Sequence, residues 1–131
     1  MTRIIGIDPG SRYTGFGVID IVGRSERYVG CGRINSMAGS MAERLNLIFT
    51  RLGEVIHEYR PDEAALEETF VNRVNAASAL VLGQARGVAF CALGVKGLTV
   101  ADLAQTFAIY PSLSGSITEA GRRLMGADHL A

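Results

Sequence analysis

The sequence predicts an α/β fold in which an antiparallel three-strand meander plus parallel strands form one mixed sheet flanked by helices. Three short apolar runs separated by tight turns come first, and a helical apolar pattern follows them. A further short apolar run then leads into a second helix. With 131 residues, 48% of them apolar and 20% charged, the chain can bury one core without disulfides or a structural metal.

The three opening runs have the length and turn chemistry of strands. Residues 3–7 end at the Asp-Pro-Gly-Ser turn of residues 8–11, residues 13–20 follow, and residues 26–34 come after the turn at 23–25. Short connections favour pairing of consecutive strands, so these runs predict the meander. The central run contains two glycines, which let another backbone or a ligand approach closely.

The period then changes to that of a helix. Residues 42–59 place apolar side chains on one face: Leu45, Ile48, Phe49, Leu52, Val55, Ile56 and Tyr59. The outward face carries Glu43, Arg51, Glu54 and Glu58. Residues 60–62 stop the helix, and residues 63–70 read as a short strand that a crossover places parallel to the first one.

A polar loop at 71–75 precedes a second helix at 76–93. Its Gly83 and Gly87 are expected to permit close packing on the sheet. Residues 94–97 end this helix, and residues 98–101 read as the next strand. Beyond that point the pattern fades, and a capping box formed by Ser116 and Glu119 predicts only a short helix at 117–125.

Composition constrains the partners only weakly. Thirteen basic and thirteen acidic residues give no net charge, which neither indicates nor excludes nucleic acid. Cys31 and Cys91 lack metal-ligand spacing and are expected to be reduced, packed thiols. No apolar run of membrane-span length stands out, and an acidic residue comes too early for a secretory signal, so we expect a cytoplasmic protein without a membrane partner.

Two carboxylates stand where a cation site is expected. Asp8 ends the first run and Glu67 lies in a run predicted to be its neighbour, so their oxygens can converge on one hard cation. The alternatives are that Asp8 only initiates a turn and that Glu67 is a solvated edge residue. Strand alternation allows only one of Glu67 and Glu68 to face Asp8, and the periodicity does not say which.

Three motifs in order, at residues 3–19, 65–72 and 78–87, resemble the RuvC family of Holliday-junction resolvases, the crossover junction endodeoxyribonucleases. The similarity covers about residues 1–100. It implies an RNase H-like nuclease core there, with an incomplete or divergent C-terminal part at 101–131 that belongs to the same domain or packs poorly.

The resemblance also implies roles for individual residues. Asp8 and Glu67 correspond to the first two catalytic, metal-binding carboxylates of the family, which favours Glu67 over its neighbour. Phe70 corresponds to an aromatic residue that stacks on bases of the junction. Arg73 and Arg86 are candidates for phosphate contacts. The alternative for Phe70 is ordinary packing, and the alternative for Arg73 and Arg86 is that they are ordinary solvated arginines.

A RuvC-like site performs metal-assisted phosphodiester hydrolysis. Two Mg²⁺ ions activate water on one side of the phosphate and stabilise the leaving oxygen on the other. The implied partners are four-way junction DNA, a second copy of the chain in a symmetric dimer, and a branch-migration helicase. The implied process is DNA recombination and repair.

The tail departs from the family pattern, in which a final helix carries two more aspartates in an Asp-x-x-Asp arrangement. Residues 101–131 contain no such pair; their candidate ligands are Asp102, Glu119, Asp128 and His129. Three explanations are open: a change of reading frame near Val100, a truncated or degenerate copy, and a variant with different ligands in its tail. Two functions therefore stay open: a magnesium-dependent junction endonuclease, and a non-catalytic junction-binding remnant that lacks two metal ligands.

The loop after the first run also fits a third class of protein. Sugar-kinase and actin-like phosphotransferases also carry a Gly-Ile-Asp-x-Gly loop on their first strand. They duplicate the domain and need a second phosphate loop, and 131 residues without either feature disfavour that function.

Overall fold

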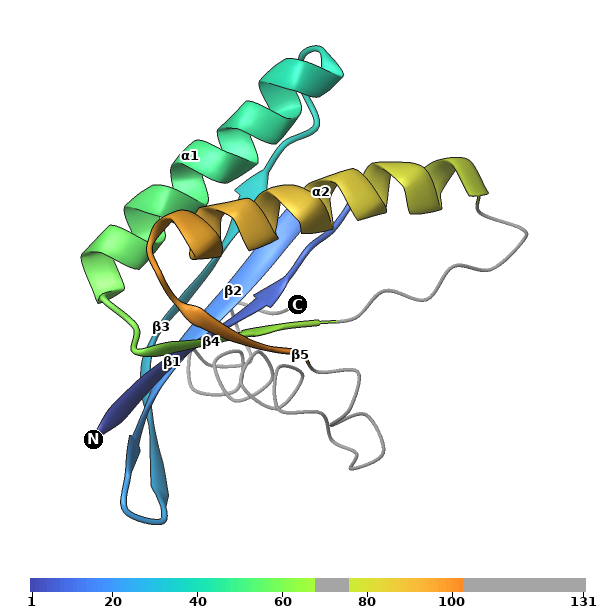
Figure 1. The fold of residues 1–131 in the computed structure, drawn as a ribbon. Helices are drawn as coiled ribbons and strands as arrows, with labels where there is room; N and C mark the ends of the chain where they lie inside the picture. The colour runs from blue at the N-terminus through green and yellow to red at the C-terminus, as the bar shows by residue number, and fades with distance from the viewer. Residues whose placement is uncertain (68–75, 103–131) are drawn as a thin grey trace, which may run out of the picture.

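The computed structural model describes residues 1–67 and 76–102, which form a five-stranded sheet and two helices (Figure 1). The elements are β1 Thr2–Asp8, β2 Tyr13–Val22, β3 Ser25–Asn35, α1 Met41–Tyr59, β4 Glu63–Leu66, α2 Ala76–Val95 and β5 Thr99–Asp102. The strand order is β3-β2-β1-β4-β5. The first three strands pair antiparallel, whereas β4 runs parallel to β1 and β5 parallel to β4. The predicted mixed sheet is confirmed.

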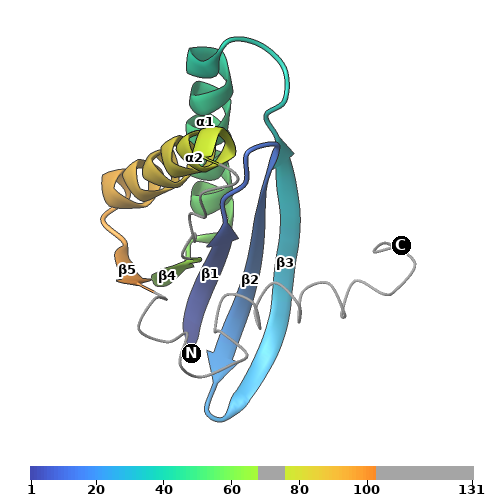
Figure 2. The same ribbon diagram turned by 90° about the vertical axis from the view of Figure 1, so that its right-hand side faces the viewer.

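Both helices lie on the same side of the sheet (Figure 2). Because side chains alternate along a strand, Ile5, Ile7 and Leu66 point into the core that α1 and α2 cover. We call this side the helix face. The opposite side, the far face, carries the alternate residues, among them Ile4 and Ile19, which form a separate small cluster.

Helix α1 begins with a capping box. Ser40 accepts a hydrogen bond from the backbone of Glu43, and the Glu43 carboxylate accepts one from the backbone of Ser40. The helix ends at Arg60, whose φ of 50° is left-handed. The expected apolar face packs on the sheet with one exception: Phe49 was predicted to be inward, yet it is 37% exposed. Its position lies at the margin of the apolar stripe, where helical spacing alone assigns sides poorly.

Helix α2 contributes Ala85, Ala89, Ala92 and Leu93 to the core. The prediction that Gly83 and Gly87 permit close packing was wrong, because both are exposed and an added Cβ at either would meet none of the described residues within 4 Å. Close approach comes from the alanines instead. By length and composition alone this helix is apolar enough to cross a membrane, which the sequence prediction missed. Here it packs against α1 and β5.

Some of the predicted elements lie partly or wholly outside the described residues. The strand predicted at 63–70 is described only to Leu66, while the loop at 71–75 and the short helix at 117–125 lie outside the described residues. Both cysteines are free, as expected, but Cys91 is exposed and not packed.

Candidate active site

The two predicted carboxylates stand side by side at the ends of adjacent parallel strands. Ile7 of β1 is paired with Leu66 of β4, and the backbone N–H of Glu67 donates to the carbonyl oxygen of Ile7 at 3.0 Å. Continuing this register sets Asp8 opposite Glu67. Because Ile7 and Leu66 both point into the core, the next residue of each strand is on the far face. Adjacent strands lie about 4.8 Å apart, so the backbones that carry the two carboxylates are direct neighbours.

The parallel alignment of β4 with β1 is braced at the opposite end of the strands by Arg3. Its backbone N–H donates to the carboxylate of Asp62 at 2.7 Å, and the N–H of Asp62 donates to the carbonyl of Arg3 at 2.8 Å. The guanidinium of Arg3 donates to the Tyr59 carbonyl at the end of α1, at 2.8 Å. It also forms a two-point ion pair with the buried Asp20, at 2.7 and 3.0 Å. These contacts set the register that brings Glu67 beside Asp8.

Asp8 is half-buried, and its carboxylate has no hydrogen-bond or ion-pair partner among the described residues. On β2 it pairs with Gly15, where an added Cβ would meet only the Cβ of Asp8, at 4.0 Å, within the described part of the chain. Gly15 in turn pairs with Arg33 on β3. Glu67, Asp8, Gly15 and Arg33 therefore form one row across four strands of the far face, which we call the carboxylate row.

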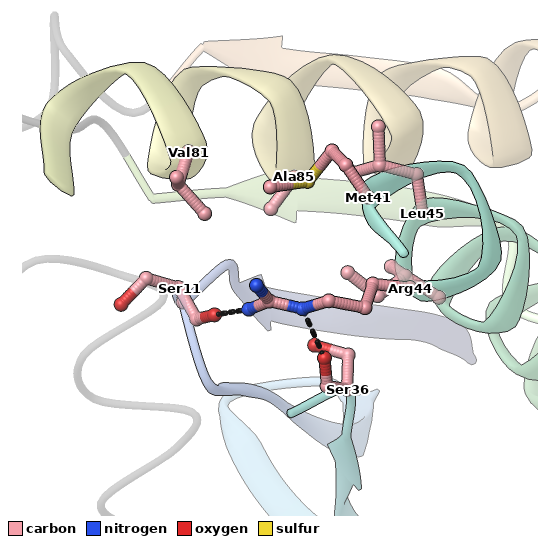
Figure 3. A pocket seen from close by; sticks show the side chains of 9 residues that line it. Ser11, Ser36, Met41, Arg44, Leu45, Val81 and Ala85 are labelled. Atoms are coloured by element: carbon pink, nitrogen blue, oxygen red, sulfur yellow. Dashed lines mark hydrogen bonds between the residues drawn. The ribbon is translucent and has the colours of Figure 1, made fainter. Parts of the chain in front are cut away.

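The turn that follows Asp8 is held tightly. A Cβ added to Gly10 would lie 2.0 Å from the carbonyl oxygen of Tyr13, so this turn requires glycine. From α1, the guanidinium of Arg44 donates to the carbonyl oxygens of Ser11 and Ser36 (Figure 3). The N–H of Ser36 donates to the carbonyl of Arg12 at 3.0 Å. Arg44 thus ties the turn after β1 to the loop after β3, beside a small pocket closed by Val81 and Ala85 of α2.

Arg86 of α2 reaches the end of β4 from the helix side. Its Nε donates to the backbone carbonyl of Glu67 at 3.4 Å, and its guanidinium lies 4.6 Å from the centre of the Phe90 ring. This contact supports the backbone that carries the second carboxylate. The role predicted for Arg86 in phosphate binding stays a prediction. Phe70 and Arg73 lie outside the described residues.

Sequence reasoning missed Arg44 and Arg33. A single arginine among the polar positions of an amphipathic helix gives no sign that it binds two distant backbone carbonyls. Arg33 lies in a strand whose register with Asp8 is visible only once the sheet is assembled. The requirement for Gly10 was detectable, because Asp-Pro-Gly-Ser is a turn sequence.

The residue types suit a hard cation, since carboxylate oxygens are the ligands that Mg²⁺ prefers and, among the described residues, only the Cβ of Asp8 comes within 4 Å of a Cβ placed at Gly15. In residues 1–67 and 76–102, no group of three or more His, Cys, Asp and Glu side chains is gathered. A cation bound here would keep several water ligands, as Mg²⁺ does in proteins.

Comparison with known proteins decides the family. The model of the family described as "Crossover junction endodeoxyribonuclease RuvC" matches residues 4–120. The chain belongs to the RuvC family. The match extends some twenty residues past residue 100, where the resemblance described above ends, and it excludes the phosphotransferase alternative.

Two curated RuvC proteins illustrate the relationship. The protein of Chromobacterium violaceum is 54% identical over 101 residues, which are 76% of this chain and 57% of the relative. That of Hahella chejuensis is 50% identical over 102 residues, or 78% and 59% of the two chains. The chain therefore spans less than two thirds of the length of these RuvC relatives.

The solved structures agree on the RNase H-like fold. The Thermus thermophilus RuvC structure superposes with a TM-score of 0.69 at 25% identity and covers 95% of this chain and 96% of that one. T. thermophilus RuvC in complex with a Holliday junction substrate gives 0.73 at 24% identity, with 96% and 97% covered. T. thermophilus RuvC thus has the same arrangement of sheet and helices as this chain.

Proposed function

We propose that this chain is a subunit of a divalent-metal-dependent endonuclease that hydrolyses phosphodiesters at four-way DNA junctions during recombination and repair. The observation that carries the proposal is the parallel register of β1 and β4, in which Ile7 pairs with Leu66 and the N–H of Glu67 donates to the Ile7 carbonyl. This register aligns Asp8 with Glu67, and Asp8 pairs with Gly15 on its other side. Membership in the RuvC family supports it, as does the T. thermophilus RuvC complex with a Holliday junction substrate.

The proposed metal ligands are Asp8 and Glu67. Bound Mg²⁺ supplies a nucleophile from water and neutralises charge on the phosphate and the leaving oxygen. The resemblance implies two ions, and the described residues contribute these two carboxylates. Asp8 is oriented by the turn that Gly10 permits and Arg44 ties down, while the backbone of Glu67 is held by Ile7 and Arg86. Gly15 has no side chain, which lets a sugar-phosphate backbone come close to the carboxylates.

Two residues outside the described part and one inside it complete the proposed DNA contacts. Phe70 is proposed to stack on a base at the junction, and Arg73 to contact phosphate. Arg86 is also proposed to contact phosphate, in addition to its hydrogen bond with the backbone carbonyl of Glu67.

A homodimer is the proposed assembly, because paired nicks on a junction need two sites related by a two-fold axis. Helix α2 offers the candidate surface: Leu80 is 72% exposed and Val95 is 71% exposed, and Arg86 is the only charged residue of the helix. A branch-migration helicase is the proposed further partner. We also propose that the protein acts on DNA in the cytoplasm and has no membrane partner.

The test is cleavage of a labelled four-way junction with Mg²⁺. We expect paired nicks from the unaltered chain and none from Asp8→Asn or Glu67→Gln, because each removes a charged metal ligand. Glu63→Gln is the matched control. Glu63 lies on the same strand and the same face as Glu67, at the other end and exposed, so its loss should leave cleavage intact.

The non-catalytic junction binder stays as the second candidate, because the described residues bring together only two carboxylates. Tight junction binding without nicks in Mg²⁺ or Mn²⁺ would favour it. Cleavage by both ligand variants at the rate of the unaltered chain would remove the physical basis of the nuclease proposal.

A further inference from the structure

The carboxylate row ends in a positive charge. Asp8 pairs with Gly15, and Gly15 pairs with Arg33, so Arg33 shares the far face with the two carboxylates. Two strand spacings, about 10 Å, separate the backbones of Asp8 and Arg33. The strand between them presents a glycine at this position, so no side chain of β2 stands in the row.

Arg33 differs from the other arginines of the sheet. Arg3 and Arg27 both pair with the buried carboxylate of Asp20. Arg33 is exposed and, within residues 1–67 and 76–102, has no carboxylate partner. Its guanidinium lies 4.5 Å from the centre of the Tyr13 ring, which restricts its position without neutralising it.

A guanidinium without an anionic partner, oriented by an aromatic ring, is suited to bind phosphate oxygens. The proposed function puts one phosphate of a DNA strand at the carboxylate end of the row. The DNA backbone leads away from that phosphate in both directions, so its neighbouring phosphates also lie near the sheet. The glycine position leads toward β3, where a backbone can pass close to the sheet and reach Arg33.

We propose that Arg33, oriented by Tyr13, binds a backbone phosphate of the same DNA strand whose scissile phosphodiester lies at Asp8 and Glu67. The inference rests on the proposed function and extends it to a binding site on β3. The contact is to the sugar-phosphate backbone, so it contributes affinity and positioning without reading sequence.

The experiment measures binding of the 131-residue chain to a fluorescent four-way junction by anisotropy, in Ca²⁺ to suppress cleavage, over a series of salt concentrations. We expect Arg33→Gln to bind several-fold more weakly, with the slope of log affinity against log salt reduced by about one, as for loss of one phosphate contact. Arg33→Lys keeps the charge and should retain most of that slope.

Arg24→Gln is the matched control, because Arg24 is an exposed arginine in the β2–β3 turn, at the other end of the sheet from Asp8. It should bind as the unaltered chain does. Melting temperatures of all variants, measured alongside, show whether each is folded.

The outcomes separate the two proposals. If the unaltered chain binds no junction, the proposed function itself fails. If it binds and folded Arg33→Gln binds with the same affinity and salt slope, only the Arg33 contact is wrong. An equal loss in Arg24→Gln would mean that overall charge, and not this row, determines binding, and would also overturn the inference.

Discussion

Replacing Thr14 by valine should stabilise the protein. Thr14 is fully buried, and its hydroxyl has no hydrogen-bond partner within the described part of the chain. Burying a hydroxyl without a partner costs about 1 to 3 kcal/mol, and valine has nearly the same shape without that group. Valine also suits a strand such as β2. We therefore expect the free energy of unfolding to rise by about 1 kcal/mol or more.

For a chain of this length, each 1 kcal/mol corresponds to roughly 3 to 6 °C in Tm. Thermal unfolding followed by circular dichroism measures the shift, and urea unfolding should show a higher midpoint with an unchanged slope. Ser36→Ala is the control of opposite sign. The buried Ser36 hydroxyl donates to the carbonyl of Arg12 at 3.3 Å, so its removal should cost about 0.5 to 1.5 kcal/mol. A lower Tm for Thr14→Val would refute the reasoning, because it would mean that the hydroxyl has a partner.

Three further perturbations test other parts of the structure. Hydrogen bonding by Arg3 lowers the pKa of Asp20 to about 2, below the unfolded value of about 3.9, so the stabilisation is present above about pH 4 and is lost as the pH falls through about 2. Asp20→Asn should therefore be less stable at pH 7 and lose this acid dependence in urea midpoints measured from pH 7 to 2.5; an unchanged dependence would contradict the assignment. Gly10→Ala should impair junction cleavage because the new Cβ meets the Tyr13 carbonyl. Gly53→Ala in α1 should leave cleavage intact and raise Tm slightly, because a Cβ there meets no atom of the described part of the chain within 4 Å; equal cleavage by both variants would count against the turn. Leu52→Ala, at a fully buried position of α1, should lower the free energy of unfolding by about 2 to 5 kcal/mol in urea titrations, and a loss below about 1 kcal/mol would mean that Leu52 is not a core residue.

Local patterns were sufficient for most of the elements. Short apolar runs ended by turn sequences predicted β1, β2 and β3 to within two residues at either end, since turn chemistry acts over neighbouring positions. The apolar stripe of α1 was confirmed except at Phe49. Predictions about the environment of a residue were weaker: Gly83 and Gly87 lie outward, and Cys91 is exposed. In a helix as uniformly apolar as α2, the sequence does not mark which side faces the sheet.

For the site, too, the sequence predicted the residue types, whereas the environment of each residue came from the structure. The residues themselves offered Asp8 and either of two glutamates, and the family motifs favoured Glu67. Only the parallel register of β4 against β1 placed Glu67 on the far face beside Asp8, because a shift of one residue sends every side chain of a strand to the other face.

By itself, then, the sequence determined the element types, the turn after β1 and the family, because these depend on spacing between near neighbours and on motif order. The tertiary structure decided which carboxylate joins Asp8, which carbonyls Arg44 binds and which charge ends the row. Those facts depend on strands and helices distant along the chain, from Asp8 to Glu67 and from Ser11 to Arg44, whose alignment is set by packing.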